Sequence, residues 1–206
     1  MLDPRAFAEL SPTTLCDVLS ADHAMDFGLR PLWSPMPRVA GPAYPVRCLP
    51  GDNLALHAAI YRAPPGAVIV VQADDIRHAV AGGNVCAIAA RRGIAAFVVD
   101  GVLRDLAETR ARAFPVFARG VVPAPGGKRG VGVLCGPVRC GGVEVCPGDL
   151  VVADEEGIVV VPAGRAEAVL VAARARAAQD AADTLDAWEA RHHAKVEELL
   201  SAAARV

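Results

Sequence analysis

Short apolar runs, separated by glycine and proline turns, dominate the middle of the chain. Residues 67–71 and 94–99 are continuous apolar runs, typical of strands that are buried on both faces of a sheet. Between them, Gly82-Gly83-Asn84 opens a segment of helical periodicity that continues through Arg92, and Gly93 closes it. The pattern therefore predicts a β-α-β unit with two parallel strands and a right-handed crossover.

The flanking sequence predicts further helices and strands. Ser11 followed by Pro12 is a favourable helix start, with serine as the cap and proline in the first turn. Residues 40–48 read as a strand, which Pro42 and Pro45 restrict to an edge or bulged position. The other expected elements cover residues 52–62 (a helix capped by Asp52, with Leu54, Ala58 and Tyr61 inward), 106–113 (a helix), 114–119 (a strand), 143–162 (three strands in hairpins) and 164–206 (one helix).

Charged residues follow the second buried strand of the β-α-β unit. In a parallel unit, the start of the helix and the end of the second strand lie on the same edge of the sheet. We therefore expect residues 82–85 to face residues 100–105. Free N–H groups at the helix start suit an anion, Arg104 can fork onto a carboxylate or phosphate, and Asp105 is a hard oxygen ligand for Mg²⁺ or Mn²⁺. The alternatives are a flexible glycine turn and a surface ion pair.

Composition and charge limit the classes of function. The 206 residues are 53% hydrophobic and 21% charged, which is typical of a chain that can bury a core. A net charge of −2 argues against a nucleic-acid or membrane-surface partner bound by electrostatics. No apolar run approaches the roughly 20 residues that span a bilayer, and the first ten residues lack a signal-peptide core, so we expect a cytoplasmic protein.

The six cysteines form no C-x-x-C pair. Cys135, Cys140 and Cys146 lie among glycines and prolines, with no histidine near them in the sequence. A structural zinc site at these three is the less favoured alternative, and we expect reduced, partly buried thiols.

The order of motifs resembles that of a known enzyme family. The chain is similar to the 4-hydroxy-4-methyl-2-oxoglutarate and 4-carboxy-4-hydroxy-2-oxoadipate aldolases, a family shared with the regulator of ribonuclease E activity A. The resemblance covers roughly residues 40–162. It rests on Gly41-Pro42-Ala43, Asp52-Asn53, Gly66, Gly82-Gly83-Asn84, Val98-Val99-Asp100-Gly101-x-x-Arg104-Asp105, Phe114-Pro115-Val116-Phe117-Ala118-Arg119-Gly120 and Pro147-Gly148-Asp149-Leu150-x-x-Ala153-Asp154.

This resemblance implies an α/β protein with a β/β/α layered fold like the swivelling phosphohistidine domain, followed by a C-terminal helix. It implies one domain over residues 1–206, assembled as a homotrimer or a hexamer of paired trimers. It also implies a divalent-metal-dependent pyruvate aldolase. The substrate-binding residues would be Gly82, Gly83, Asn84, Val85 and Arg104, with Arg104 and Asp105 catalytic and Asp105 binding the metal partly through water. Asp180 and Asp183 are candidates for an acid given to a neighbouring subunit.

The chemistry of the implied reaction favours a metal. Cleavage of a 4-hydroxy-2-oxo acid leaves pyruvate enolate, which either an iminium or a metal must stabilise. Lys128 and Lys195 are the only lysines, and neither lies at a strand end or in an apolar run where a Schiff-base lysine belongs. We therefore expect Mg²⁺ or Mn²⁺, and oxaloacetate decarboxylation as a side activity. The general base stays open between a water on the metal and Asp100.

A second class of function competes with the enzyme. A non-catalytic protein that binds and regulates a ribonuclease needs only an exposed surface. Members that only regulate tend to lack the acid after the motif arginine, and Asp105 is present here, which favours the enzyme. A methyltransferase needs an adenosyl-binding glycine loop after the first strand, and the sequence contains none.

Overall fold

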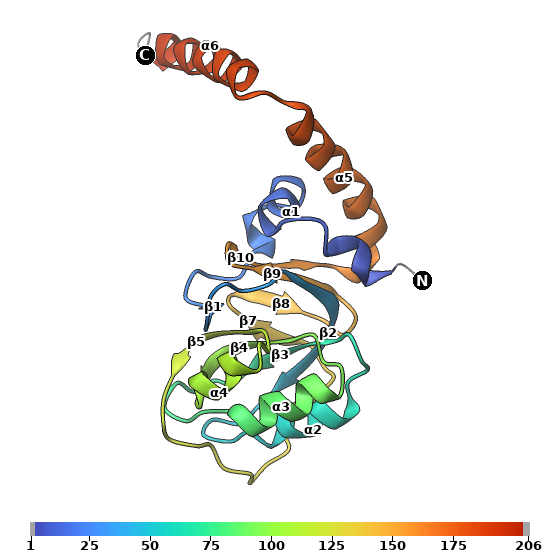
Figure 1. The fold of residues 1–206 in the computed structure, drawn as a ribbon, viewed down its shortest axis with the longest axis vertical. Helices are drawn as coiled ribbons and strands as arrows, with labels where there is room; N and C mark the ends of the chain where they lie inside the picture. Colours follow the sequence, from blue (N-terminus) through green and yellow to red (C-terminus); the bar gives the residue numbers. More distant parts are fainter. Residues whose placement is uncertain (1–2, 204–206) are drawn as a thin grey trace.

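The computed structural model shows a mixed sheet flanked by helices, with a helical arm that reaches away from the body (Figure 1). The structure describes residues 3–203. The main sheet has the order β1-β5-β4-β3-β2-β9-β10, with β6 paired to β2, and β7 and β8 form a separate hairpin. The strands are β1 (Arg30–Pro31), β2 (Val39–Arg47), β3 (Val68–Gln72), β4 (Ala96–Leu103), β5 (Val116–Val121), β6 (Val133–Leu134), β7 (Val138–Cys140), β8 (Val143–Val145), β9 (Leu150–Asp154) and β10 (Gly157–Val161). The helices are η1 (Pro4–Phe7), α1 (Pro12–Leu19), η2 (Ala21–His23), α2 (Leu54–Arg62), α3 (Gly83–Arg91), α4 (Leu106–Ala111), η3 (Ala163–Arg165), α5 (Ala166–Ala182) and α6 (Leu185–Ala203).

Four neighbouring parallel strands form the part of the sheet that carries α2, α3 and α4. Strands β2, β3, β4 and β5 run parallel, and Val71 of β3 lies opposite Val99 of β4. One apolar cluster fills the space between these strands and the helices, and it includes Leu56, Ile69 and Phe97. Burial of these side chains is the main force that holds the helices on this face. The predicted β-α-β unit of β3, α3 and β4 is confirmed.

Two antiparallel strands, β9 and β10, lie on the side of the body away from α2, α3 and α4 (Figure 1). Strand β9 pairs with the first half of β2, and β10 pairs with β9. Helices α1 and α5 pack on this pair through a separate apolar cluster. Ser11 caps α1, because its side-chain oxygen accepts from the N–H of Thr14 at 3.1 Å. The expected α/β class with β/β/α layers is confirmed.

Strand β2 lies inside the sheet, so the predicted edge position is wrong. Its first half pairs with β9 through Pro42, and its second half pairs with β3 through Pro45. Each proline therefore pairs with a neighbouring strand on one side only. The missing N–H of each proline costs no hydrogen bond to a second strand.

Two helix predictions also need correction. In α2 the buried residues are Ala55, Leu56, Ala59 and Ile60, whereas Tyr61 is 55% exposed. The expected inward face is therefore rotated, because a short helix with apolar residues on several sides does not define its face by periodicity. The expected single C-terminal helix is broken, since Asp183 has extended backbone dihedrals between α5 and α6. Within residues 3–203, no helix has both the length and the apolar character needed to cross a membrane.

Candidate active site

The end of β4 delivers Arg104 and Asp105 to the start of α3. The sequence pattern ended this strand at Val99, but it continues to Leu103 after a register shift between Val99 and Val102. Gly101 lies in this irregular stretch, where a Cβ would approach the Cβ of Ala73 to 2.6 Å. The glycine therefore lets the strand pass close to the loop that leads into α3.

Backbone hydrogen bonds tie that loop to the strand end. The N–H of Val80 donates to the carbonyl of Val102, and the N–H of Arg104 donates to the carbonyl of Ala81, both at 3.0 Å. The main chain thus fixes the separation between the start of α3 and the charged pair that follows β4. Side-chain geometry in the site rests on this frame.

Asp105 and the first turn of α3 are in direct contact. The N–H of Gly83 donates to Asp105 Oδ2 at 3.1 Å. Arg104 Nε lies 3.5 Å from the same oxygen, and the two side chains are 42% and 38% exposed. This ion pair is longer than a good hydrogen bond, so it leaves the guanidinium free to bind another partner. The predicted meeting of residues 82–85 with residues 100–105 is confirmed at Gly82 and Gly83, which contact Arg104 and Asp105.

Two glycines at the start of α3 make room for two carboxylates. A Cβ on Gly82 would lie 2.3 Å from Asp105 Oδ2, and a Cβ on Gly83 would lie 2.1 Å from Glu108 Oε2. Only glycine lets both acids sit against this backbone. Sequence reasoning missed Glu108. No pattern in the sequence identifies it, because its position over Gly83 depends on how α4 packs against α3.

The N-terminus of α3 is open toward the same place. Gly82 is the cap residue and offers no side chain, and the N–H of Gly83 is taken by Asp105. Within residues 3–203, the N–H groups of Asn84 and Val85 have no acceptor. Two unpaired N–H groups beside an arginine are chemically suited to a carboxylate.

The backbone of Asp105 turns its carboxylate toward α3. Asp105 is the cap residue of α4 and has left-handed dihedrals of φ 58° and ψ 43°, yet its side chain makes no capping bond to α4. Its carbonyl oxygen accepts from Thr109 instead, through the backbone N–H at 3.1 Å and through Oγ1 at 3.2 Å. A strained residue whose carboxylate serves another element is typical of a functional position.

The donor set fits a magnesium-type ion. Mg²⁺ in proteins is usually held by one or two carboxylates, with water and substrate oxygens completing the shell. Asp105 and Glu108 supply two carboxylates over the glycine cradle. Among the described residues there is no group of three or more His, Cys, Asp or Glu side chains arranged for a metal, which also applies to the three candidate zinc cysteines. The six thiols are free.

Asp100 faces the other side of the sheet. Its carboxylate accepts from Arg119 Nε and, at 2.8 Å, from the N–H of Gly141. Arg119 also forks onto Asp26, with its two terminal nitrogens 3.2 and 2.8 Å from the carboxylate oxygens. The hydrogen bonds to Asp100 and Asp26 raise the pKa of Arg119. Asp100 therefore belongs to a structural network, and it is not placed to act as a base on a substrate beside Arg104.

The remaining candidates lie away from this site. Lys195 pairs with Glu198 on α6 at 2.9 Å, and Lys128 is exposed in the glycine-rich loop after β5. Asp180 pairs with Arg176 at 3.2 Å, and Asp183 pairs with Arg191, so both acids lie on the C-terminal arm. A cavity of about 280 Å³ adjoins the site. It is lined by Arg104, Asp105, Leu106, Val121, Val122 and Pro123.

Comparison with known proteins gives a consistent answer. The sequence model of the RraA-like family, described as Aldolase/RraA, matches residues 12–160. A protein of Halalkalibacterium halodurans named "Putative 4-hydroxy-4-methyl-2-oxoglutarate aldolase" is 41% identical over 177 residues, which cover 85% of this chain and 84% of the relative.

Solved structures agree with the sequence comparison. The RNA-processing inhibitor RraA from Thermus thermophilis is 30% identical with a TM-score of 0.67, covering 73% of this chain and 91% of that one. Streptomyces coelicolor RraAS2, described as an unusual member of the RNase ES inhibitor RraA family, is 30% identical with a TM-score of 0.78, covering 86% and 92%. The family match spans more than half of the sequence. This protein therefore belongs to the RraA-like, Aldolase/RraA family.

Proposed function

We propose that this protein is a divalent-metal-dependent aldolase that cleaves a 4-hydroxy-2-oxo acid into pyruvate and a second oxo acid. The observation that carries the proposal is the meeting of three groups at one place. These are the unpaired N–H groups at the start of α3, the Arg104 guanidinium and the Asp105 carboxylate. An anion site beside a hard oxygen ligand matches a substrate that has a carboxylate next to a keto group.

The protein's own residues would bind and orient the pyruvate half of the substrate. The N–H groups of Asn84 and Val85 would bind the carboxylate, and Arg104 would reach both the carboxylate and the keto oxygen. In the cleavage step, the hydroxyl at C4 gives its proton to a water molecule, the C3–C4 bond breaks, and C4 becomes the carbonyl carbon of the second oxo acid. The electron pair of that bond passes to the C2 oxygen, and Arg104 offsets the charge of the enolate that forms. Protonation at C3 then gives pyruvate.

Asp105 and Glu108 are the residues that would hold the metal. A bound divalent cation supplies Lewis acidity toward the keto group. The N–H of Gly83 donates to Asp105 Oδ2 at 3.1 Å and so holds this carboxylate in place. The same site would decarboxylate oxaloacetate, because loss of CO₂ from that acid leaves the same enolate.

Pyruvate release from a panel of 4-hydroxy-2-oxo acids tests the proposal. With Mg²⁺ or Mn²⁺ present we expect turnover, and with EDTA we expect none. Borohydride added together with pyruvate should leave the protein unmodified, because neither Lys128 nor Lys195 lies in the site. A covalent pyruvyl-lysine adduct, or full turnover in EDTA, contradicts the metal mechanism.

A non-catalytic regulator of a ribonuclease is the second candidate. The observation that favours it is the similarity to the RNA-processing inhibitor RraA of Thermus thermophilis. Such a protein would bind its partner through a surface and would need neither Asp105 nor a metal. Ribonuclease inhibition that is unchanged in an Asp105 variant, with no pyruvate release from any tested acid, favours this function over the aldolase.

A further inference from the structure

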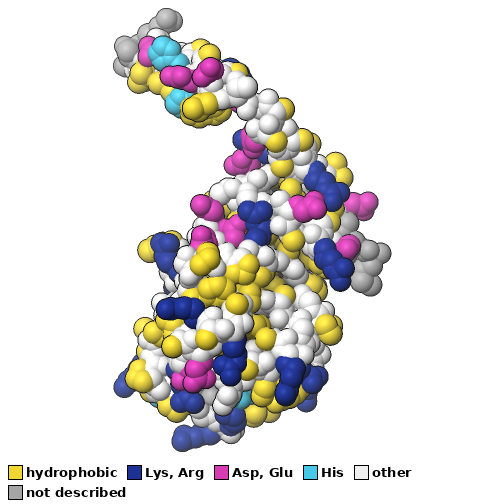
Figure 2. Space-filling model, viewed as in Figure 1, with side chains coloured by type: hydrophobic (Ala, Val, Ile, Leu, Met, Phe, Trp, Pro, Cys, Tyr) yellow, Lys and Arg dark blue, Asp and Glu magenta, His cyan; other side chains and the backbone are white. Residues whose placement is uncertain are grey.

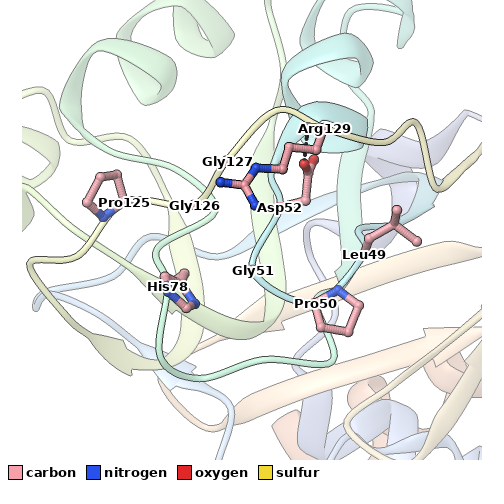
Figure 3. A pocket seen from close by; sticks show the side chains of 9 residues that line it. All are labelled: Leu49, Pro50, Gly51, Asp52, His78, Pro125, Gly126, Gly127 and Arg129. Atoms are coloured by element: carbon pink, nitrogen blue, oxygen red, sulfur yellow. Dashed lines mark hydrogen bonds between the residues drawn. The ribbon is translucent and has the colours of Figure 1, made fainter.

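A second cavity lies at the carboxyl ends of β2 and β3, apart from the Arg104 site. Its volume is about 490 Å³, within the range of small-molecule pockets. The loop after β2 forms one wall and the glycine-rich loop after β5 forms the other (Figure 3). It is lined by Leu49, Pro50, Gly51, Asp52, His78, Pro125, Gly126, Gly127 and Arg129. Parallel sheets commonly bind ligands at this edge.

Backbone contacts hold the glycine-rich loop rigidly against the wall. The N–H of Gly127 donates to the carbonyl of Gly51 at 2.8 Å, and the N–H of Asn53 donates to the carbonyl of Gly127 at 2.8 Å. The buried Asp52 carboxylate accepts from the N–H groups of Arg129 and Gly130. Hydrogen bonds within the fold therefore hold the two walls of the cavity in place.

The Asp52 charge is already balanced within this wall. Burial alone would raise the pKa of Asp52, but donation from the N–H groups of Arg129, Leu54 and Gly130 outweighs burial and lowers it. Asp52 therefore stays ionised, and these backbone donors satisfy it. The Arg129 guanidinium makes no hydrogen bond or ion pair with any residue of the described range 3–203, so its charge is available to the cavity.

His78 lines the cavity together with Arg129. The stem of Arg129 passes 3.8 Å from the position of a Cβ on Gly127, and His78 Nδ1 passes 3.6 Å from that of a Cβ on Gly51. Because the two glycines are hydrogen bonded to each other, the two side chains line the same cavity (Figure 3). Asp75 Oδ2 lies 2.6 Å from His78 Nδ1, which orients the ring and leaves Nε2 to meet a ligand.

We propose that this cavity is a second ligand site, which binds a small oxyanion, a carboxylate or a phosphate, between Arg129 and His78. Arginine presents a planar fork that matches both kinds of anion. Because the Asp75 carboxylate accepts from His78 Nδ1, Nε2 donates to the anion in the doubly protonated form of the ring. Leu49, Pro50 and Pro125 supply the apolar part of the wall. This site shares no lining residue with the cavity beside Arg104, so it is a separate place from the proposed aldolase site.

Titrations with inorganic phosphate and with malonate test the proposal in the full-length protein. We expect NMR shifts at the ring of His78 and at the N–H groups of Gly127 and Arg129, with a millimolar or tighter dissociation constant. Arg129→Gln keeps most of the side-chain stem and removes the charge, so it should weaken binding about tenfold or more. Arg110→Gln is the matched control, because Arg110 is also an exposed arginine but lies on α4 away from the cavity.

The two anions and the control separate the outcomes. Binding of phosphate alone identifies a phosphoryl ligand, binding of malonate alone identifies a carboxylate ligand, and either result supports the site. Equal weakening by Arg129→Gln and Arg110→Gln overturns it, because the effect would then be general electrostatics. Absence of shifts at His78 with both anions also overturns it. Pyruvate release by Arg129→Gln should equal that of the unmodified protein, which separates this site from the proposed aldolase.

Discussion

At the scale of single residues, the ion pair between Arg104 and Asp105 contributes little to the free energy of unfolding. Their mutual contact is 3.5 Å, and both side chains are more than a third exposed. Exposed pairs of this kind add at most about 1 kcal/mol to the free energy of unfolding. Their substitution therefore tests function with little change in folding, provided that the residue placed at position 105 can adopt left-handed backbone dihedrals.

Asparagine is the suitable replacement for Asp105. The residue has φ 58°, a conformation that asparagine adopts more readily than alanine does, and its amide oxygen can still accept from Gly83. We expect Asp105→Asn to keep its melting temperature and to lose metal-dependent pyruvate release by orders of magnitude. Mn²⁺ binding, measured by electron paramagnetic resonance, should weaken in parallel. Near-normal turnover in this variant shows that the metal binds elsewhere.

The fork of Arg104 is tested by a lysine, which keeps the charge and loses the planar pair of donors. If Arg104 binds both carboxylate and enolate, Arg104→Lys should lose about 2–4 kcal/mol of transition-state stabilisation. The loss should appear in kcat as well as KM, because the enolate forms only during reaction. Oxaloacetate decarboxylation at saturating Mg²⁺ measures both constants, and Arg110→Lys is the control. Retention of more than about a third of kcat/KM removes Arg104 from the site.

At the scale of elements, the sequence predicted what depends on periodicity and missed what depends on packing. The runs at 67–71 and 94–99 and the glycines at 82–83 were enough to predict the meeting of α3 with the end of β4. The register shift after Val99 carries no periodic signal, so the orientation of Asp100 toward Gly141 was not predictable. Glu108 was missed for a similar reason, since its position over Gly83 depends on how α4 packs.

The close packing of α4 on α3 makes its own prediction. In an ordinary helix, glycine to alanine is stabilising by about 0.5–1 kcal/mol. At Gly83 the new Cβ would lie 2.8 Å from the Cβ of Glu108 as well as 2.1 Å from its carboxylate, so the turn must shift. We expect Gly83→Ala to cost about 1–3 kcal/mol and to reduce pyruvate release.

Gly164→Ala is the control for this measurement, because no atom lies within 4 Å of its Cβ position. Thermal unfolding and kinetics of both variants should separate steric overlap from the general effect of losing a glycine. A more stable Gly83→Ala variant with normal turnover contradicts the close packing of α4 against α3.

At the scale of the whole molecule, the C-terminal arm is the feature that a single copy leaves unexplained. Helix α6 has no buried residue, and it extends from the body beyond α5 (Figure 1). Figure 2 shows hydrophobic side chains on it, beside its acids and histidines. With helical spacing, one face carries an apolar stripe. The stripe consists of Leu185, Trp188, Val196, Leu199 and Leu200. A homo-oligomer in which this stripe packs on another copy is therefore our proposal for the assembly.

Charged substitutions on the stripe test this assembly. Leu199 and Leu200 are 56% and 59% exposed in the single chain, so Leu199→Asp with Leu200→Asp should leave the fold of one copy intact. In an assembly, the same change buries two unpaired carboxylates, at a cost of several kcal/mol. We expect light scattering to show a trimer or hexamer for the unmodified protein and a smaller species for the double variant. Ala194→Asp, on the opposite face of α6, should keep the full mass. If the double variant also keeps the full mass, the subunits assemble through other surfaces, because two buried charges on the stripe would have separated them.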